Sequence, residues 1–237
     1  MSFKLKNSVE CPNCMYQNPL FRLTCQNCSS YLRSRIVNID FWKTFWNVIE
    51  SPIKTFRKII YAEHKNFTLL LSLFIAVKLV LLYIFVINIA DETKAANLFN
   101  ISSISILTLS IIFIFIIGSY LITKINSFLG LSNRLKDNLA IIIFSFSPLI
   151  LVLFILTPVE YALFRNFWYV HNPSPFIIKP VSAYIITGIE GIILVWSLIL
   201  LVTANFVQTH NKFYSIIITL LFVIFLIVTI TLVGLNL

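Results

Sequence analysis

The chain has 237 residues, of which 59% are hydrophobic and only 11% are charged, and its formal net charge is +9 at pH 7. Soluble domains carry about 25% charged residues, so this composition excludes an ordinary soluble domain and is typical of a protein that crosses a membrane several times. The basic residues gather beside the apolar stretches, where such residues set the orientation of membrane spans. Their placement argues against nucleic-acid binding.

The chain contains only four cysteines, which form two CxxC pairs near its start: Cys11, Cys14, Cys25 and Cys28. Zinc in structural sites is held tetrahedrally by four such thiolates, so the pattern predicts a structural zinc ribbon within residues 1–36. A rubredoxin-type iron centre uses the same ligands, and disulfide or redox chemistry is the rival interpretation. The first thirty residues contain no signal peptide, which favours the reducing cytoplasm. Glycine often follows the second Cys of such a turn, but Met15 and Ser29 stand there.

Residues 37–66 predict an amphipathic segment beside the membrane. Apolar side chains recur at three- and four-residue spacing, as on one helix face: Trp42, Phe45, Trp46, Ile49, Ile53, Phe56 and Ile60. Asp40 suits an N-cap, and Ser51-Pro52 predicts a break into two helices. Helices with aromatic residues opposite basic ones lie in the membrane interface. The predicted interfacial anchors are Trp42, Phe45, Trp46, Lys54, Arg57 and Lys58. The alternative is that the apolar face packs on the protein's own spans.

Five apolar stretches reach the ~20 residues that a membrane helix needs: about 67–90, 101–123, 138–158, 182–204 and 213–235. We therefore expect an all-α membrane protein, with five transmembrane helices in residues 67–237 after the amphipathic segment and the ribbon. The loop after the first span is slightly acidic, with Asp91, Glu92 and Lys94, whereas the loops after the second and fourth are basic. Because basic residues mark the cytoplasmic side, the N-terminus is expected inside and the C-terminus outside, in the inner membrane if the protein is bacterial.

Two charged residues interrupt the spans: Lys78 in the first and Glu190 in the fourth. Charges in hydrocarbon are costly, and these two have opposite sign and a similar expected depth, so we predict a buried pair. Two alternatives stay open, namely independent placement at a wet cavity and a proton or ion relay. The small residues Ala183, Thr187 and Gly191 recur every fourth residue in the fourth span, which predicts close packing of a central helix.

The loop between the third and fourth spans is rich in aromatic residues. Such residues are typical of an interfacial belt, with their rings among the lipid headgroups: Tyr161, Phe164, Phe167, Trp168 and Tyr169. A ligand site in this loop is the alternative interpretation.

Several stretches carry a family resemblance. ESPIKTFRKIIYAEHKN before the first span, FSFSPLILV in the third, TPVEYALF and NPSP after it, and VWSLILL in the fourth resemble the prokaryotic Yip (Ypt-interacting protein) domain family, over about residues 40–237. The resemblance implies five spans with a cytoplasmic N-terminus and a ribbon added in front. Eukaryotic Yip proteins are non-enzymatic membrane factors that bind Rab-type GTPases in vesicle traffic, so the resemblance implies no catalytic residues.

The sequence contains no motif of an enzyme: the chain has five glycines and three dispersed histidines, without a phosphate loop or a recognisable nucleophile and base. We therefore expect a non-enzymatic membrane adaptor or scaffold, whose ribbon presents a surface to a protein partner on the cytoplasmic side of the lipid bilayer. The alternative is a small transporter or ion- or proton-conducting protein that uses Lys78 and Glu190. The sequence indicates no particular oligomeric state, cargo or partner.

Overall fold

The computed structural model describes residues 7–90 and 98–237. The charges of Asp91, Glu92 and Lys94, which contributed to the predicted orientation, lie outside the described residues. The chain forms two compact units, each of which is described by itself. Unit 1 consists of Met1–Leu69, Phe115–Ser145 and Leu198–Val223, and unit 2 consists of Leu70–Ile114, Phe146–Ser197 and Ile224–Leu237.

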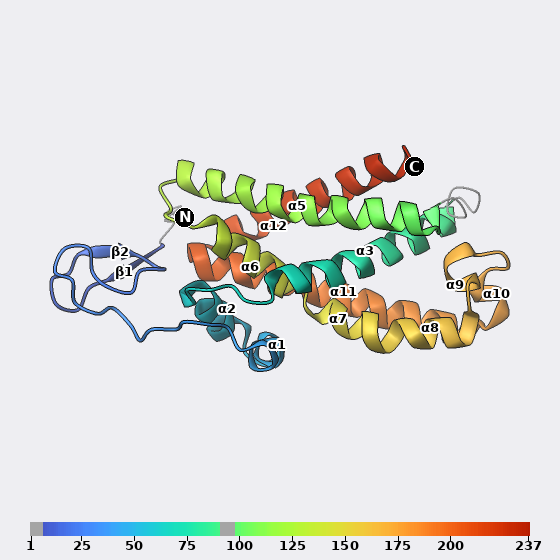
Figure 1. Cartoon of the computed structure of the whole chain (residues 1–237), viewed down its shortest axis with the longest axis horizontal. Coiled ribbons are helices and arrows are strands. Elements are labelled where there is room, and N and C mark those ends of the chain that lie inside the picture. The colour runs from blue at the N-terminus through green and yellow to red at the C-terminus, as the bar shows by residue number, and fades with distance from the viewer. Residues whose placement is uncertain (1–6, 91–97) are drawn as a thin grey trace. The chain divides into compact units, whose positions relative to one another are not determined.

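The described chain is mostly helical, with one small sheet ahead of the first helix (Figure 1). The sheet pairs β1 (Ser8–Glu10) with β2 (Gln17–Pro19), and two short helices follow, α1 (Phe41–Glu50) and α2 (Pro52–Tyr61). Four helices in the described part are long and apolar enough to span a membrane: α3 (Thr68–Ala90), α5 (Ile101–Phe128), α11 (Pro180–Thr209) and α12 (Lys212–Gly234). The predicted fold class, a helical membrane protein with a small N-terminal ribbon, is thereby confirmed.

The third predicted span, 138–158, is a broken helix and not a continuous one. Its parts are α6 (Leu135–Ser145), α7 (Pro148–Leu151), the π-helical turn η1 (Val152–Leu156) and α8 (Thr157–Phe164). A proline lacks an N–H and its ring clashes with the carbonyl four residues earlier, so Pro148 explains the break and Pro158 the wider turn before it. The broken helix counts as a fifth span or as a re-entrant segment.

In unit 1, the two short helices begin where the sequence predicts. The side chain of Asp40 caps α1 by accepting a hydrogen bond from the backbone N–H of Lys43 at 3.0 Å, and Pro52 is the first residue of α2. Both helices pack against α6, and their inward faces bury Phe45, Val48, Phe56, Ile59 and Ile60. Three of the seven residues of the predicted apolar face, Phe45, Phe56 and Ile60, therefore pack on the protein itself.

Also in unit 1, α11 runs five residues beyond its predicted end at 204. The reason is hydrogen bonding by polar side chains in its last turns. Asn205 donates to the hydroxyl of Thr219 at 3.0 Å, and Gln208 accepts from Asn133 at 3.0 Å. Buried polar side chains are normally hydrogen-bonded. Because Asn205 and Gln208 have such partners, the helix can continue through polar residues inside unit 1.

In unit 2, the aromatic loop after α8 is largely interior. Two short helices form there, α9 (Phe167–Val170) and α10 (Pro175–Ile178). Trp168 stacks on Phe85 with ring centroids 4.8 Å apart, and Tyr169 stacks on Phe99 at 5.1 Å. The predicted interfacial belt is therefore wrong for the three buried rings, Phe164, Trp168 and Tyr169, while Tyr161 and Phe167 are exposed. Aromatic pairing within the protein outweighs placement among headgroups.

The small-residue positions of α11 in unit 2 do not all serve close packing. Ala183 is buried, but Gly191 is exposed, and a side chain added there would meet no atom within 4 Å. The prediction of a central helix packed through this ridge is therefore wrong. Among the predicted spans, the most continuously buried stretch is instead residues 140–150, around the break in the third one.

Candidate functional site

The four cysteines lie on two turns with the same backbone hydrogen bonds. In the first turn, the N–H of Met15 donates to the carbonyl of Cys11 at 2.9 Å, and the N–H of Cys11 donates to Tyr16. In the second, the N–H of Ser29 donates to the carbonyl of Cys25 at 3.1 Å, and the N–H of Cys25 donates to Ser30. Each CxxC turn therefore points its two sulfur atoms to one side, as a four-thiolate centre requires.

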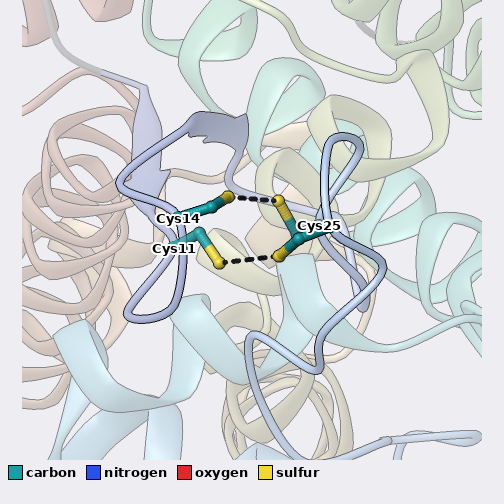
Figure 2. A group of neighbouring side chains, drawn as sticks. Cys11, Cys14 and Cys25 are labelled. Atoms are coloured by element: carbon teal, nitrogen blue, oxygen red, sulfur yellow. Dashed lines mark hydrogen bonds between the residues drawn. The ribbon is translucent and has the colours of Figure 1, made fainter.

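The sulfur atoms converge on one point. Figure 2 shows the side chains of Cys11, Cys14 and Cys25 turned toward a common centre. All four Sγ atoms lie within 4.8 Å of one another, with 3.6 Å between Cys11 and Cys28 and 3.5 Å between Cys14 and Cys25. A tetrahedron with metal–sulfur bonds of about 2.3 Å has edges of about 3.8 Å. The thiols are free of disulfides, so this donor set fits a tetrahedral metal ion.

The residues that replace the expected glycines take up a glycine-like backbone. Met15 has φ +58° and Ser29 has φ +59°, so both lie in the left-handed region that disfavours side chains. The departure in the sequence therefore leaves the turn geometry intact.

Within unit 1, two arginines join the ribbon to the helices. The guanidinium of Arg33 lies 4.4 Å from the ring centre of Tyr61 and donates to the carbonyls of Phe21 and Tyr61 at 3.0 Å. The guanidinium of Arg134 lies 4.5 Å from the ring centre of Phe21. Stacking on a ring together with hydrogen bonds to carbonyls suits arginine better than lysine. These contacts connect the ribbon to the end of α2 and the start of α6.

A cluster of buried charges lies at the end of α2, and we call it the α2-end cluster: Lys65, Arg134 and Asp137. Asp137 accepts from Arg134 at 2.7 and 3.1 Å and pairs with Lys65 at 2.9 Å. Lys65 also donates to the backbone carbonyls of Ile59, Ile60 and Ala62, and Arg134 donates to that of Ile60 at 3.1 Å. Burial lowers the pKa of Lys65 to about 8, although Asp137 opposes the shift.

A second cluster lies in unit 2, among the apolar helices, and we call it the intramembrane cluster: Lys78, Glu160 and Glu190. The ammonium of Lys78 contacts a carboxylate oxygen of Glu190, lies 3.5 Å from one of Glu160, and donates to the hydroxyl of Thr157 at 3.1 Å. The exposed fractions of the three charged side chains are 1%, 0% and 4%, in the order of their numbers. The hydroxyl of Tyr169 donates to the other oxygen of Glu160 at 3.1 Å.

Glu160 and Asp137 lie just outside the predicted third span, 138–158, but both are buried partners of a lysine. For Glu160 a signal was present. The stretch TPVEYALF continues the apolar third span, and Thr157, Glu160, Tyr161 and Phe164 follow helical spacing. Extending that span by six residues would have placed a third charge in the apolar helices. For Asp137 the signal is weaker, because an acid beside Arg134 and Lys136 also fits an exposed loop.

The predicted interfacial anchors divide into two groups. Trp42 and Trp46 are 68% and 51% exposed, and the basic residues Lys54, Arg57 and Lys58 are also exposed. Phe45 is only 3% exposed because it faces inward in unit 1. The prediction that Phe45 reaches the membrane interface is therefore wrong.

The family model of the Yip1 domain matches residues 46–235 of the chain. This range includes both charge clusters and begins after the four cysteines. Searches of curated proteins and of solved structures return no match.

Proposed function

Because the chain belongs to the Yip1 domain family of non-enzymatic trafficking factors, we propose that it is an integral membrane adaptor or scaffold in membrane organisation or trafficking. Its N-terminal ribbon supplies the surface that binds a protein partner. One observation carries this proposal: the four-cysteine ribbon precedes the matched region and has three large exposed side chains. Met15, Tyr16 and Tyr31 are 66%, 46% and 75% exposed.

Those three residues have the chemistry of a binding surface. Tyrosine is enriched at the energetic centres of protein interfaces, and methionine adapts its shape to different partners. A segment of about thirty residues is too small for a sufficient apolar core. A bound metal would therefore supply the folding free energy and hold these side chains in place.

We propose zinc as the metal, held by Cys11, Cys14, Cys25 and Cys28. Four thiolates leave no open coordination position, so the site is structural. An iron centre uses the same donors, and elemental analysis of protein purified without refolding distinguishes the two metals. The proposal divides the chain into a ribbon at 1–36, juxtamembrane helices at 37–66 and a five-span domain at 67–237.

The exposed face of α1 and α2 supports placement of these helices in the membrane interface. Trp42 and Trp46 would enter the headgroup region, and Lys54, Arg57 and Lys58 would meet anionic lipid. The basic loops favour a cytoplasmic N-terminus and an outer C-terminus. A reporter active only in the cytoplasm, fused after Leu237, should then give no signal, whereas fusion after Lys212 should give one. The reverse pattern, with signal after Leu237 and none after Lys212, is the result expected if the broken third helix is re-entrant.

Site-specific photocrosslinking tests the partner surface. A photoreactive residue at Tyr31 should capture a defined protein in native membranes, and the same residue at Tyr184, which is 68% exposed on α11, serves as the control. Tyr31→Ser should abolish co-purification of that protein while the metal content stays unchanged. Retention of the partner by Tyr31→Ser, Met15→Ser and a chain without residues 1–36 would refute the role of the ribbon.

The intramembrane cluster favours a second candidate function, a small transporter or proton-conducting protein that uses Lys78 and Glu190. Ionisable residues within spans often mark ion pathways. Reconstituted vesicles containing the full chain should then show a proton or cation flux that Glu190→Gln abolishes. Equal flux in protein-containing and empty vesicles would refute this candidate.

A further inference from the structure

The intramembrane cluster contains one more acid than base. Lys78 carries one positive charge, whereas Glu160 and Glu190 together carry two negative charges when both are ionised. All three side chains are at most 4% exposed. A net charge that is removed from water and lacks a counter-charge is strongly unfavourable. Full ionisation of this cluster therefore leaves one negative charge without compensation.

The described contacts of the two carboxyls involve one ammonium and one hydroxyl donor. Lys78 lies on α3, and its ammonium is shared among Glu160, Glu190 and the hydroxyl of Thr157. From α9, Tyr169 directs its hydroxyl at Glu160. The hydroxyl of Thr157 itself donates back to the carbonyl of Val152 in the π-helical turn. Among the residues that the structure describes, the titratable groups in contact with the two carboxyls are Lys78 of α3 and Tyr169 of α9, and the carboxyls themselves come from α8 and α11.

The two carboxyl groups share one counter-ion. Oε1 of Glu160 and Oε1 of Glu190 both lie against the ammonium of Lys78, which brings the two carboxyl groups close together. Two ionised carboxylates have only acceptors, so a hydrogen bond between them needs a proton on one of the two. Pairs of carboxyl groups that share a site keep one proton because both cannot ionise at short range.

We propose that Glu160 and Glu190 bind one proton between them, which makes the intramembrane cluster a neutral, single-proton binding site. The proton comes from water and adds to a carboxylate oxygen, so no redox partner or other reactant is needed. One carboxyl then stays ionised beside Lys78, and the other is neutral and can donate to it. This proposal is independent of the ribbon and of any flux, because a bound proton need not be conducted.

Infrared spectroscopy of the full chain in lipid nanodiscs tests the proposal. A protonated carboxyl has a carbonyl band separate from those of carboxylates and amides, and its shift in heavy water identifies it. At neutral pH the wild type should show this band, and both Glu160→Gln and Glu190→Gln should lack it. Glu50→Gln, on an exposed position of α1, should keep it. A wild type without the band, or a band unchanged in both cluster variants, would overturn the proposal.

A further variant tests the charge balance. In Lys78→Met the ammonium is gone, so both carboxyls should be protonated and the band should increase about twofold. An unchanged band in folded Lys78→Met would contradict the proposed balance. If that variant does not fold, the two Gln variants decide alone, because they replace a carboxyl by an amide of the same shape.

Discussion

Unit 1 and unit 2 each contain a buried three-residue charge cluster, and the two clusters have opposite compositions. The α2-end cluster has two bases and one acid, whereas the intramembrane cluster has one base and two acids. In the first, the surplus positive charge faces the last carbonyls of α2, where the helix dipole is negative. Its Arg134 is also 27% exposed. In the second, all three side chains are buried among apolar helices.

The difference shows that buried charge can be balanced in two ways. At the α2 end, the backbone carbonyls and the partial exposure of Arg134 accommodate the surplus, so every member can stay ionised. The side chains of the intramembrane cluster are at most 4% exposed, and there we propose that a proton removes the surplus. The following predictions test this contrast, beginning with the largest expected effect.

Removal of the metal should unfold the ribbon completely, because the metal supplies its folding free energy. Through Phe21 and Asn7 the ribbon contacts Arg134 and the nearby chain of unit 1. Hydrogen exchange should therefore increase in residues 7–35 and around 132–137, and should stay unchanged around Thr157 and Glu160. Mass spectrometry of the full chain with and without a chelator measures both. Equal exchange with and without chelator would show that the ribbon does not depend on a metal.

Lys78→Met should have the largest effect on the stability of unit 2. Removing one partner of a buried ion pair costs about 3–5 kcal/mol, and here two carboxyls lose the ammonium that both of them contact. The loss should shrink as the pH falls toward the ordinary carboxyl pKa, because both carboxyls are neutral in the folded variant and the unfolded chain then binds protons as well. Thermal unfolding in detergent at several pH values measures it. Combining Lys78→Met with Glu190→Gln should recover part of the loss, and strictly additive losses would show that the residues do not interact.

Asp137→Asn should cost less, about 1–3 kcal/mol, the typical loss when a buried hydrogen-bond partner is removed. Lys65 and Arg134 would still donate to the carbonyls at the end of α2. Unfolding of this variant beside Lys136→Gln, which removes an exposed neighbouring charge, provides the comparison. A larger loss than that of Lys78→Met would refute the contrast between the clusters.

Near neutral pH, the pH dependence of stability that arises from Lys65 should be the smallest effect, because its ammonium is mostly protonated there in the folded and the unfolded chain. Burial lowers its pKa from 10.5 to about 8, so the folded chain releases a proton that the unfolded chain still binds. The unfolding free energy should therefore rise between about pH 8 and 10.5. Lys65→Met should remove this rise, and Lys58→Met, on an exposed position of α2, should keep it. A stability that falls over this range in wild type alone would contradict the burial of Lys65.

Local sequence patterns predicted much of this structure, because their causes are local. The spacing of the cysteines, the break at Pro52 and the four continuous apolar helices depend on neighbouring residues only. The positions of Lys78 and Glu190 within their predicted spans indicated a similar depth in the membrane, and their side chains are in contact. Whether they stabilise one another stays a prediction that the variants above test.

The errors concern residues whose surroundings come from distant parts of the chain. Phe45 and Trp46 are adjacent and equally apolar, yet only Trp46 is exposed, because α6 covers one side of α1. The aromatic loop predicted an interfacial position for Trp168, but this residue is buried and stacks on Phe85 of α3. Glu160 lies beyond the predicted end of the third span at 158, whereas the helix continues through the π-helical turn to Phe164.

A count of neutral carboxyl groups tests the contrast between the clusters most directly. The chain has nine Asp and Glu residues, and carbon-13 labelling of their carboxyl groups allows NMR to count the protonated ones at neutral pH. We expect the equivalent of one protonated carboxyl group per chain. It should be lost in Glu160→Gln and in Glu190→Gln, and it should be retained in Asp137→Asn. Nine ionised carboxylates in the folded wild type, or a neutral carboxyl that disappears only in Asp137→Asn, would contradict the account.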